Sequence, residues 1–211
     1  MQISLQQLER DVATEIINIG LCEAADSLSF FTKEKVLIKG FDYALEKITD
    51  YQITGKNSSE IHLLSSEIKG EMSGYCFLLF TTNEVNSLHQ ISLPEPVLND
   101  SERLLEMGKA ILLEVKNIIT ASVVTHFSNL LGYKMHGYIP ELETIPASAL
   151  ADKVFSKIQK YDYVLHFRAT FLSSGHNIEP EFIWTLDEKF IEGVKNIVNN
   201  DHSLKKLRQN L

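Results

Sequence analysis

The segments Glu15-Ile16-Ile17-Asn18 and Glu114-Val115-Lys116-Asn117 share the pattern Glu-x-x-Asn and lie 99 positions apart (15 to 114, 18 to 117). Each copy lies in a long segment with the apolar spacing of an amphipathic helix, where residues three apart project from the same face. Each helix is therefore expected to present a carboxylate beside a carboxamide. Because Asn is a poor residue for a helix interior, its matched position in both copies indicates a chemical role. The repeat indicates an internal duplication.

The first half of the chain predicts a long helix, three strands and a short helix. Ser4 and Gln7 form a capping-box pattern, and the apolar stripe that follows predicts a helix ending near Phe31. Strands are expected over 36–38, 62–68 and 75–80, with a hairpin turn at 69–70. Thr82 is expected to cap a short helix that ends at about Ile91.

The second half repeats this order. A helix is expected from Ser101 to Gly132, followed by strands over 163–172 and 178–184 around a turn at 173–177. Asp187 is expected to cap a terminal helix that ends at Val198, and a further helical stretch is expected around 147–157.

The predicted organisation is a single domain over 1–211, made of two repeats at about 1–93 and 101–200. Pro94 and Pro96 mark a linker over 94–100, because proline continues neither a helix nor a central strand. Residues 201–211 form a basic tail.

Composition excludes several classes of protein. A net charge of −8, from 20 basic and 28 acidic residues, argues against a nucleic-acid surface. The chain has neither an uninterrupted apolar run of about 20 residues nor a secretion signal, so it is expected in the cytoplasm with no membrane partner. Cys22 and Cys76 are expected to be buried thiols, and the seven histidines lack metal-binding spacings, so no metal site is predicted.

Polar residues form a stripe on each long helix. On the first helix the stripe contains Asp11, Glu15, Asn18 and Cys22. The equivalent positions of the second helix are Ala110, Glu114, Asn117 and Ala121, where two alanines flank the polar pair. Small alanines beside the second pair suit the docking of a macromolecule. A carboxamide donates and accepts hydrogen bonds at once, so it can hold a water in line with a phosphorus atom, as the glutamine of small GTPases does. A neighbouring glutamate can pair with a basic group of the partner.

These residues resemble the CheC/CheX/FliY family of phosphatases, which act on the chemotaxis response regulator CheY and carry the motif [Asp/Ser]-x3-Glu-x2-Asn-x22-Pro. Asp11, Glu15 and Asn18 match in the first half, where Phe41 replaces the proline; Glu114, Asn117 and Pro140 match in the second, where Ala110 replaces the leading residue. The resemblance covers nearly the whole chain, and two sites per chain make CheC the closest member. It implies an α/β (α+β) CheC-like fold with pseudo-two-fold symmetry, two long helices side by side on a β-sheet, and the two sites at opposite ends of their exposed faces.

The resemblance also implies a function in chemotaxis or two-component signalling. Asn18 and Asn117 would position the hydrolytic water, and Glu15 and Glu114 would contact the regulator, with Asp11 and Pro140 in supporting positions. The partner would be a phosphorylated CheY-like response regulator that holds the Mg²⁺ itself, so no cofactor is expected on this chain, which is expected to be a monomer or weak dimer with CheD as a possible second partner.

Two non-catalytic alternatives stay open. A Glu and an Asn on a helix face are ordinarily solvated surface residues, and a duplicated domain can retain both pairs without catalysis. The chain can also be an adaptor that binds a response regulator or CheD without accelerating phosphate release.

Overall fold

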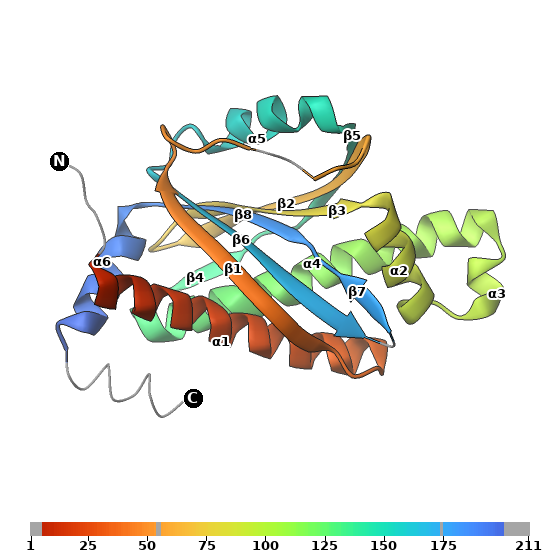
Figure 1. The fold of residues 1–211 in the computed structure, drawn as a ribbon, viewed down its shortest axis with the longest axis horizontal. Helices are drawn as coiled ribbons and strands as arrows, with labels where there is room; N and C mark the ends of the chain where they lie inside the picture. Colours follow the sequence, from red (N-terminus) through yellow and green to blue (C-terminus); the bar gives the residue numbers. More distant parts are fainter. Residues whose placement is uncertain (1–5, 54–55, 174, 201–211) are drawn as a thin grey trace.

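A computed structural model describes residues 6–53, 56–173 and 175–200. Two long helices lie side by side against one face of a curled antiparallel sheet, and a shorter helix covers part of the other face (Figure 1). This arrangement confirms the predicted α+β class and the pairing of the two long helices on a sheet.

The elements follow one another as α1 (Gln7–Thr32), β1 (Leu37–Lys47), β2 (Glu60–Gly70), β3 (Gly74–Thr81), α2 (Thr82–Ser92), α3 (Glu95–Leu98), α4 (Ser101–Leu131), β4 (Met135–Gly137), β5 (Glu141–Pro146), a 3₁₀ turn (Ala147–Ala149), α5 (Leu150–Ile158), β6 (Tyr163–Ser173), β7 (His176–Ile178), β8 (Glu181–Leu186) and α6 (Glu188–Val198). The sheet has the order β1-β6-β8-β3-β2-β4, with β5 also paired to β2 and β7 to β6. Every pairing is antiparallel.

The strand order interleaves the two halves of the chain. β1 of the first half pairs with β6 of the second, whereas β4 and β5 of the second half pair with β2 of the first. The central contact joins β3 to β8, which are the second strands of the two predicted hairpins. When β2 and β3 are matched with β6 and β8, the strand order is the same counted from either edge of the sheet, as a pseudo-two-fold arrangement requires. The duplication itself stays a prediction.

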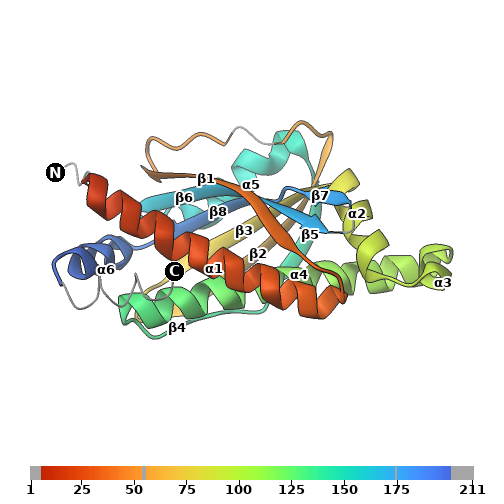
Figure 2. The same cartoon turned by 60° about the horizontal axis from the view of Figure 1, so that its bottom comes forward.

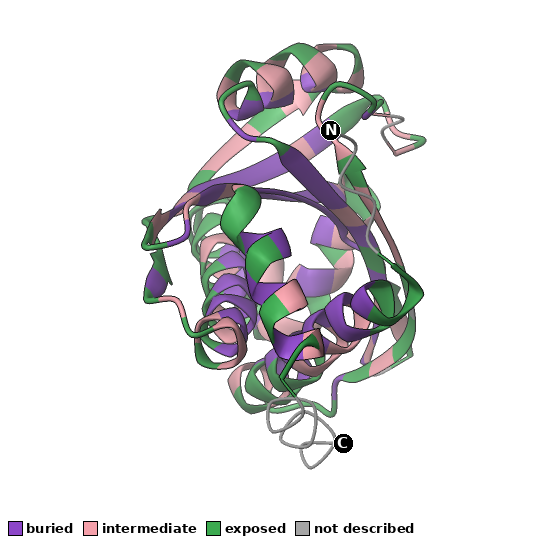
Figure 3. Ribbon diagram, turned by 90° about the vertical axis from the view of Figure 1, so that its left-hand side faces the viewer, coloured by how far each residue is buried: buried purple, intermediate pink, exposed green. Residues whose placement is uncertain are grey.

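Both faces of the sheet are apolar, because alternate residues of a strand point to opposite sides. On β3, Cys76, Leu78 and Phe80 face the core beneath α1 and α4, whereas Phe77 and Leu79 face the core beneath α5. The buried sides of all three helices turn toward the sheet (Figure 3). The sheet is thus the middle layer, and the long helices keep one face in solvent.

Helix ends follow local capping rules. α4 begins after Asp100, whose carboxylate accepts hydrogen bonds from the N–H groups of Glu102 and Arg103, and it ends at Gly132 in the left-handed conformation with φ of 77°. The predicted bounds of this helix are confirmed, as is the Asp187 cap of α6.

Two predicted caps are corrected. Thr81, rather than Thr82, caps α2, because Glu84 at the third helical position completes a capping box with it. α1 begins after Gln6, whose N–H donates to the Glu9 carboxylate at 2.7 Å, while Ser4 lies outside the described residues.

The prolines and short strands also differ from expectation. The linker contains the helical turn α3, since Pro94 caps it and Pro96 lies in its first turn, where a missing N–H is tolerated. The strand predicted over 178–184 begins only at Glu181, as β8, after Pro180, and part of the turn predicted over 173–177 forms the short strand β7. The extra helix is confirmed as α5, while β4 and β5 before it were not predicted. The basic tail, 201–211, lies outside the described residues.

Among the described helices, only α4 is long and apolar enough to cross a membrane. Glu114 and Lys116 interrupt its apolar run in the sequence. Half of the most apolar window of α4 is buried inside the fold, as expected of a core helix.

Candidate functional site

The two long helices run antiparallel and approach closely (Figure 2). Gly20 permits this contact, since a Cβ at that position would lie 3.1 Å from the Cα of Val123. Glu23 and the buried His126 meet across the same interface, with Oε1 and Nδ1 3.4 Å apart. The antiparallel arrangement places Glu15 and Asn18 toward one end of the helix pair and Glu114 and Asn117 toward the other.

The second pair lies in solvent. Leu112, Val115 and Ile119 turn one side of α4 into the core, so Glu114 and Asn117 project from the other side and are both exposed. The flanking Ala110 and Ala121 are exposed too, which leaves the helix surface around the pair open to another molecule. The Asn117 carboxamide is therefore not packed inward.

Exposed apolar side chains border the second pair. Glu114 and Ile118 line a shallow surface depression together with Phe30 at the end of α1, and the Phe30 side chain is 89% exposed. Lys33 and Lys35 line the same depression. Sequence reasoning missed Phe30, whose only signal is an aromatic residue outside the buried stripe of α1.

The segment between β4 and β5 lies on the other side of α4. Here Gly137 packs against Thr120, since a Cβ on Gly137 would lie 2.9 Å from the Thr120 methyl carbon. Pro140 is half-buried in this segment, next to Ile139, which is 73% exposed.

A buried lysine lies beneath the second pair. Lys116 is only 1% exposed, and its Nζ lies 2.6 Å from Thr120 Oγ1, 2.8 Å from Cys76 Sγ and 3.1 Å from Ser66 Oγ. An ammonium has three N–H donors, and here each finds one neutral acceptor. Sequence reasoning missed this anchor of α4 to β2 and β3, although position 116 lies at an apolar spacing, four residues after Leu112.

The first pair is less accessible. Glu15 and Asn18 are both half-buried, and the Oε1 atom of Glu15 is buried with no hydrogen-bond partner among the described residues. Asp11 is exposed and accepts a hydrogen bond from Gln7 Nε2 at 2.8 Å. Phe41, at the position of the motif's proline, pairs with Ala169 in the ladder between β1 and β6.

Cys22 completes the stripe of α1 and corrects an expectation. The prediction of a buried thiol is right for Cys76 and wrong for Cys22, which is exposed because it lies on the solvent side of the helix. Partial burial, together with the charges of Asp26 and Glu15, raises the pKa of the Cys22 thiol. Proximity to Glu15 agrees with the predicted alignment of the stripe.

Within residues 6–53, 56–173 and 175–200, no group of three or more His, Cys, Asp or Glu side chains is placed to hold a metal ion. The two pairs offer one carboxylate each, which is too few ligands for a divalent cation. What the second pair presents is a hydrogen-bonding amide and a carboxylate on an open surface.

No protein-family model matches the chain. FliY of Thermotoga maritima is similar over 92% of this chain and 97% of its own, with a TM-score of 0.66 and 19% sequence identity. CheX of Desulfovibrio desulfuricans is similar over 82% of this chain and 99% of its own, with a TM-score of 0.52 and 15% identity. The FliM middle domain of Vibrio alginolyticus is similar over 88% of this chain and 99% of its own, with a TM-score of 0.54 and 13% identity.

At these identities the likeness concerns the fold. The structural neighbours nevertheless include FliY and CheX, two of the three proteins named by the resemblance of the motifs. The predicted fold is confirmed: the chain has the fold of the solved FliY and CheX structures.

Proposed function

We propose that the chain is an aspartyl-phosphate phosphatase that acts on the receiver domain of a CheY-like response regulator. The observation that carries this proposal is the exposed pair of Glu114 and Asn117 on α4. A side-chain amide that inserts into a partner must be exposed on the surface of its own protein, and Asn117 is exposed. The fold shared with CheX, a chemotaxis protein, supports the same class of partner.

In this mechanism Asn117 supplies position rather than basicity. Its carboxamide accepts a hydrogen bond from a water and donates one at the same time, which aligns the water with the phosphorus atom. The water attacks phosphorus and the bond from phosphorus to the aspartyl oxygen breaks. Inorganic phosphate departs with the oxygen and protons of the water, and the aspartate carboxylate stays on the receiver domain. Phosphoryl transfer depends strongly on such alignment.

Glu114 sets the depth and angle at which the amide enters. One turn from Asn117, its carboxylate is available to pair with a basic residue that lines the phosphorylation pocket of the regulator. Phe30 and Ile139, on opposite sides of α4, offer apolar contact area around this polar centre. Interfaces with an apolar anchor beside a few aligned polar groups bind specifically.

The divalent cation of the reaction belongs to the partner in this proposal. Mg²⁺ held by the receiver domain would neutralise the charge on the phosphoryl oxygens. Asn18 and Glu15 are proposed to act in the same way as the second pair, with Asp11 and Pro140 supporting docking. The proposed location is the cytoplasm, where response regulators are found.

The test follows phosphate release from a phosphorylated CheY-type receiver mixed with the purified protein. We expect Asn117→Ala to lower the rate about 10²–10³-fold, as the loss of one transition-state contact typically does. Asn18→Ala is expected to lower it as well, and the double variant to abolish acceleration. Asn129→Ala is the matched control, because Asn129 is an exposed amide elsewhere on α4. Full activity in the double variant would remove the proposal.

A second candidate is a binding module without catalysis. The likeness to the FliM middle domain favours this alternative, as it extends the fold beyond CheX and FliY. Such an adaptor would bind the phosphorylated regulator, or CheD, through the same exposed surface of α4. Tight binding with no acceleration of phosphate release would identify it.

A further inference from the structure

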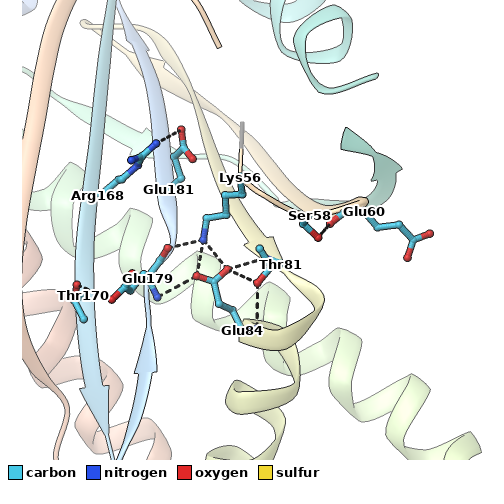
Figure 4. A network of polar contacts seen from close by, with 9 residues as sticks. All are labelled: Lys56, Ser58, Glu60, Thr81, Glu84, Arg168, Thr170, Glu179 and Glu181. Atoms are coloured by element: carbon cyan, nitrogen blue, oxygen red, sulfur yellow. Dashed lines mark hydrogen bonds and ion pairs between the residues drawn. The ribbon is translucent and has the colours of Figure 1, made fainter. Parts of the chain in front are cut away.

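The sheet carries a polar pocket on the face opposite α1 and α4 (Figure 4). Glu181 lies two residues before Ile183, which packs beneath α5, so it projects from that face. Strand register places Asp42 of β1, Arg168 of β6 and Glu181 of β8 in one row. Together with Lys56, Thr170 and Glu179, these residues line a cavity of about 710 Å³.

Glu181 is a fully buried carboxylate with one unsatisfied oxygen. Its Oε1 lies 2.7 Å from His166 Nε2 and 3.6 Å from an Arg168 nitrogen, whereas its Oε2 is buried with no hydrogen-bond partner among the described residues. A buried acceptor left unpaired costs about 1–3 kcal/mol, so such a group marks a missing donor.

The carboxylate is charged. Burial alone would raise the pKa of Glu181, but the hydrogen bond and charge of His166, with the charges of Arg168 and Lys56, together lower it. Its empty acceptor therefore carries negative charge and attracts a cationic donor.

The second cationic side chain of the pocket, Lys56, already has acidic and carbonyl partners. Lys56 Nζ lies 2.5 Å from a carboxylate oxygen of Glu84 and also donates to the Glu179 carbonyl (Figure 4). The charged groups that remain are the carboxylates of Asp42, Glu179 and Glu181 against the guanidinium of Arg168 and the ring of His166, which contacts Glu181. Three carboxylates exceed these two cations even when His166 is protonated. The pocket thus has an excess of negative charge.

We propose that this pocket binds a guanidinium group, which donates one N–H to Glu181 Oε2 and others to the carboxylates of Glu179 or Asp42. A metal ion does not fit, since no metal-binding cluster of three or more side chains occurs in the described part of the chain. A guanidinium is planar, presents several N–H donors in a fork and is weakly hydrated, which suits a buried carboxylate. The ligand is either a free guanidinium compound or an arginine side chain of another protein.

Access to Glu181 requires a small movement of Arg168. This side chain is 54% exposed, and its contact with Glu181 at 3.6 Å is longer than a hydrogen bond. An incoming guanidinium competes with Arg168 for the same carboxylate, so removal of Arg168 should strengthen binding.

The test uses calorimetric titration and thermal unfolding with methylguanidinium, and with N-methylurea as its neutral counterpart of the same shape. We expect methylguanidinium to bind and to raise the melting temperature at concentrations up to about 100 mM, and N-methylurea to do neither. Arg168→Ala should tighten binding several-fold, and Glu181→Gln should weaken it at least tenfold. A capped Gly-Arg-Gly peptide that binds better than methylguanidinium would identify a partner's arginine as the ligand.

Two further variants show whether an effect of Glu181→Gln reflects lost binding or lost folding. Asp42→Asn changes an exposed carboxylate of the pocket and should weaken binding without affecting the fold, whereas Glu60→Gln, an exposed carboxylate that does not line the pocket, should leave binding unchanged. Equal binding of N-methylurea, no binding of methylguanidinium, or unchanged affinity in both Glu181→Gln and Asp42→Asn would overturn the proposal. None of these results bears on the phosphatase proposal, because the pocket lies on the other face of the sheet.

Discussion

The pair on α1 and the pair on α4 share one spacing but not one environment. Glu114 and Asn117 stand in solvent beside the exposed Phe30, whereas Glu15 and Asn18 are half-buried and Glu15 has a buried oxygen without a partner. A motif that is repeated in sequence is thus presented differently by the two halves of the molecule. Exposure distinguishes a pair that can enter a partner from one that must first move.

The residue beneath each pair differs as well. Ile17, which corresponds to Lys116 in the repeat, is buried in the apolar core, whereas Lys116 finds three polar acceptors from Ser66, Cys76 and Thr120. At this position, therefore, α1 packs an apolar side chain into the core, whereas α4 forms hydrogen bonds to the sheet in addition to its apolar contacts.

The largest expected effect comes from exchanging these anchors. Ile17→Lys should lower the free energy of unfolding by more than about 4 kcal/mol, because it would bury an ammonium in the apolar core at that position. Lys116→Met should change it by less than about 1 kcal/mol, since an apolar side chain of similar length replaces a desolvated charge. Urea denaturation of both variants measures the difference. Similar losses in the two would show that the environments do not differ as described.

The next effect compares the two amides. Asn117→Ala should lower the phosphate-release rate at least about tenfold more than Asn18→Ala, because Asn117 is exposed whereas Asn18 is half-buried, and a lost transition-state contact is worth about 10²–10³-fold. Single-turnover rates with excess phosphatase report this ratio. A larger loss for Asn18→Ala would assign the principal site to α1.

A smaller effect concerns the apolar border of the second pair. Phe30→Ala should raise KM about tenfold and leave kcat unchanged, because an exposed aromatic anchor contributes to docking rather than to chemistry. Leu105→Ala is the control, as Leu105 is 79% exposed on α4 outside the surface around the pair. A fall in kcat would indicate that Phe30 acts on the orientation of Asn117.

The smallest effect tests the unpaired oxygen. Glu15→Met should raise the free energy of unfolding by about 1 kcal/mol, because it removes a buried acceptor without a partner. Glu114→Met should change it by less than about 0.5 kcal/mol, because Glu114 is exposed. Thermal unfolding at matched pH measures both. A destabilised Glu15→Met variant would mean that the carboxylate has a stabilising role.

Long, periodic elements were predicted well from sequence. The bounds of α4 follow from an apolar stripe between Ser101 and Gly132, and both hairpins follow from alternating apolar runs. β4 and β7 escaped prediction because three residues are too few for a periodic pattern, and β5 because its pairing with β2 spans distant sequence. Thr81 was missed in favour of its neighbour, although Glu84 three residues later specifies the cap.

Sequence identified the paired residues but not their surroundings. Exposure of Asn117, burial of the Glu15 Oε1 atom and the polar contacts of Lys116 all depend on which strands lie under each helix. The pocket around Glu181 has the same origin, since it joins Asp42, Arg168 and Glu181 from three strands that lie far apart in the chain. Such groupings arise only from tertiary pairing.

The exchange of edge strands between the two halves has a consequence for how the molecule holds together. Because β1 is bonded to β6 and β5 to β2, each half completes the sheet of the other. If the chain were cleaved between α3 and α4, the two fragments would stay associated through these strand pairings without a covalent link. Each fragment alone would have strands with unpaired backbone hydrogen-bonding groups. The two halves are therefore held together by strand pairing across the sheet, and not only by the covalent link between them.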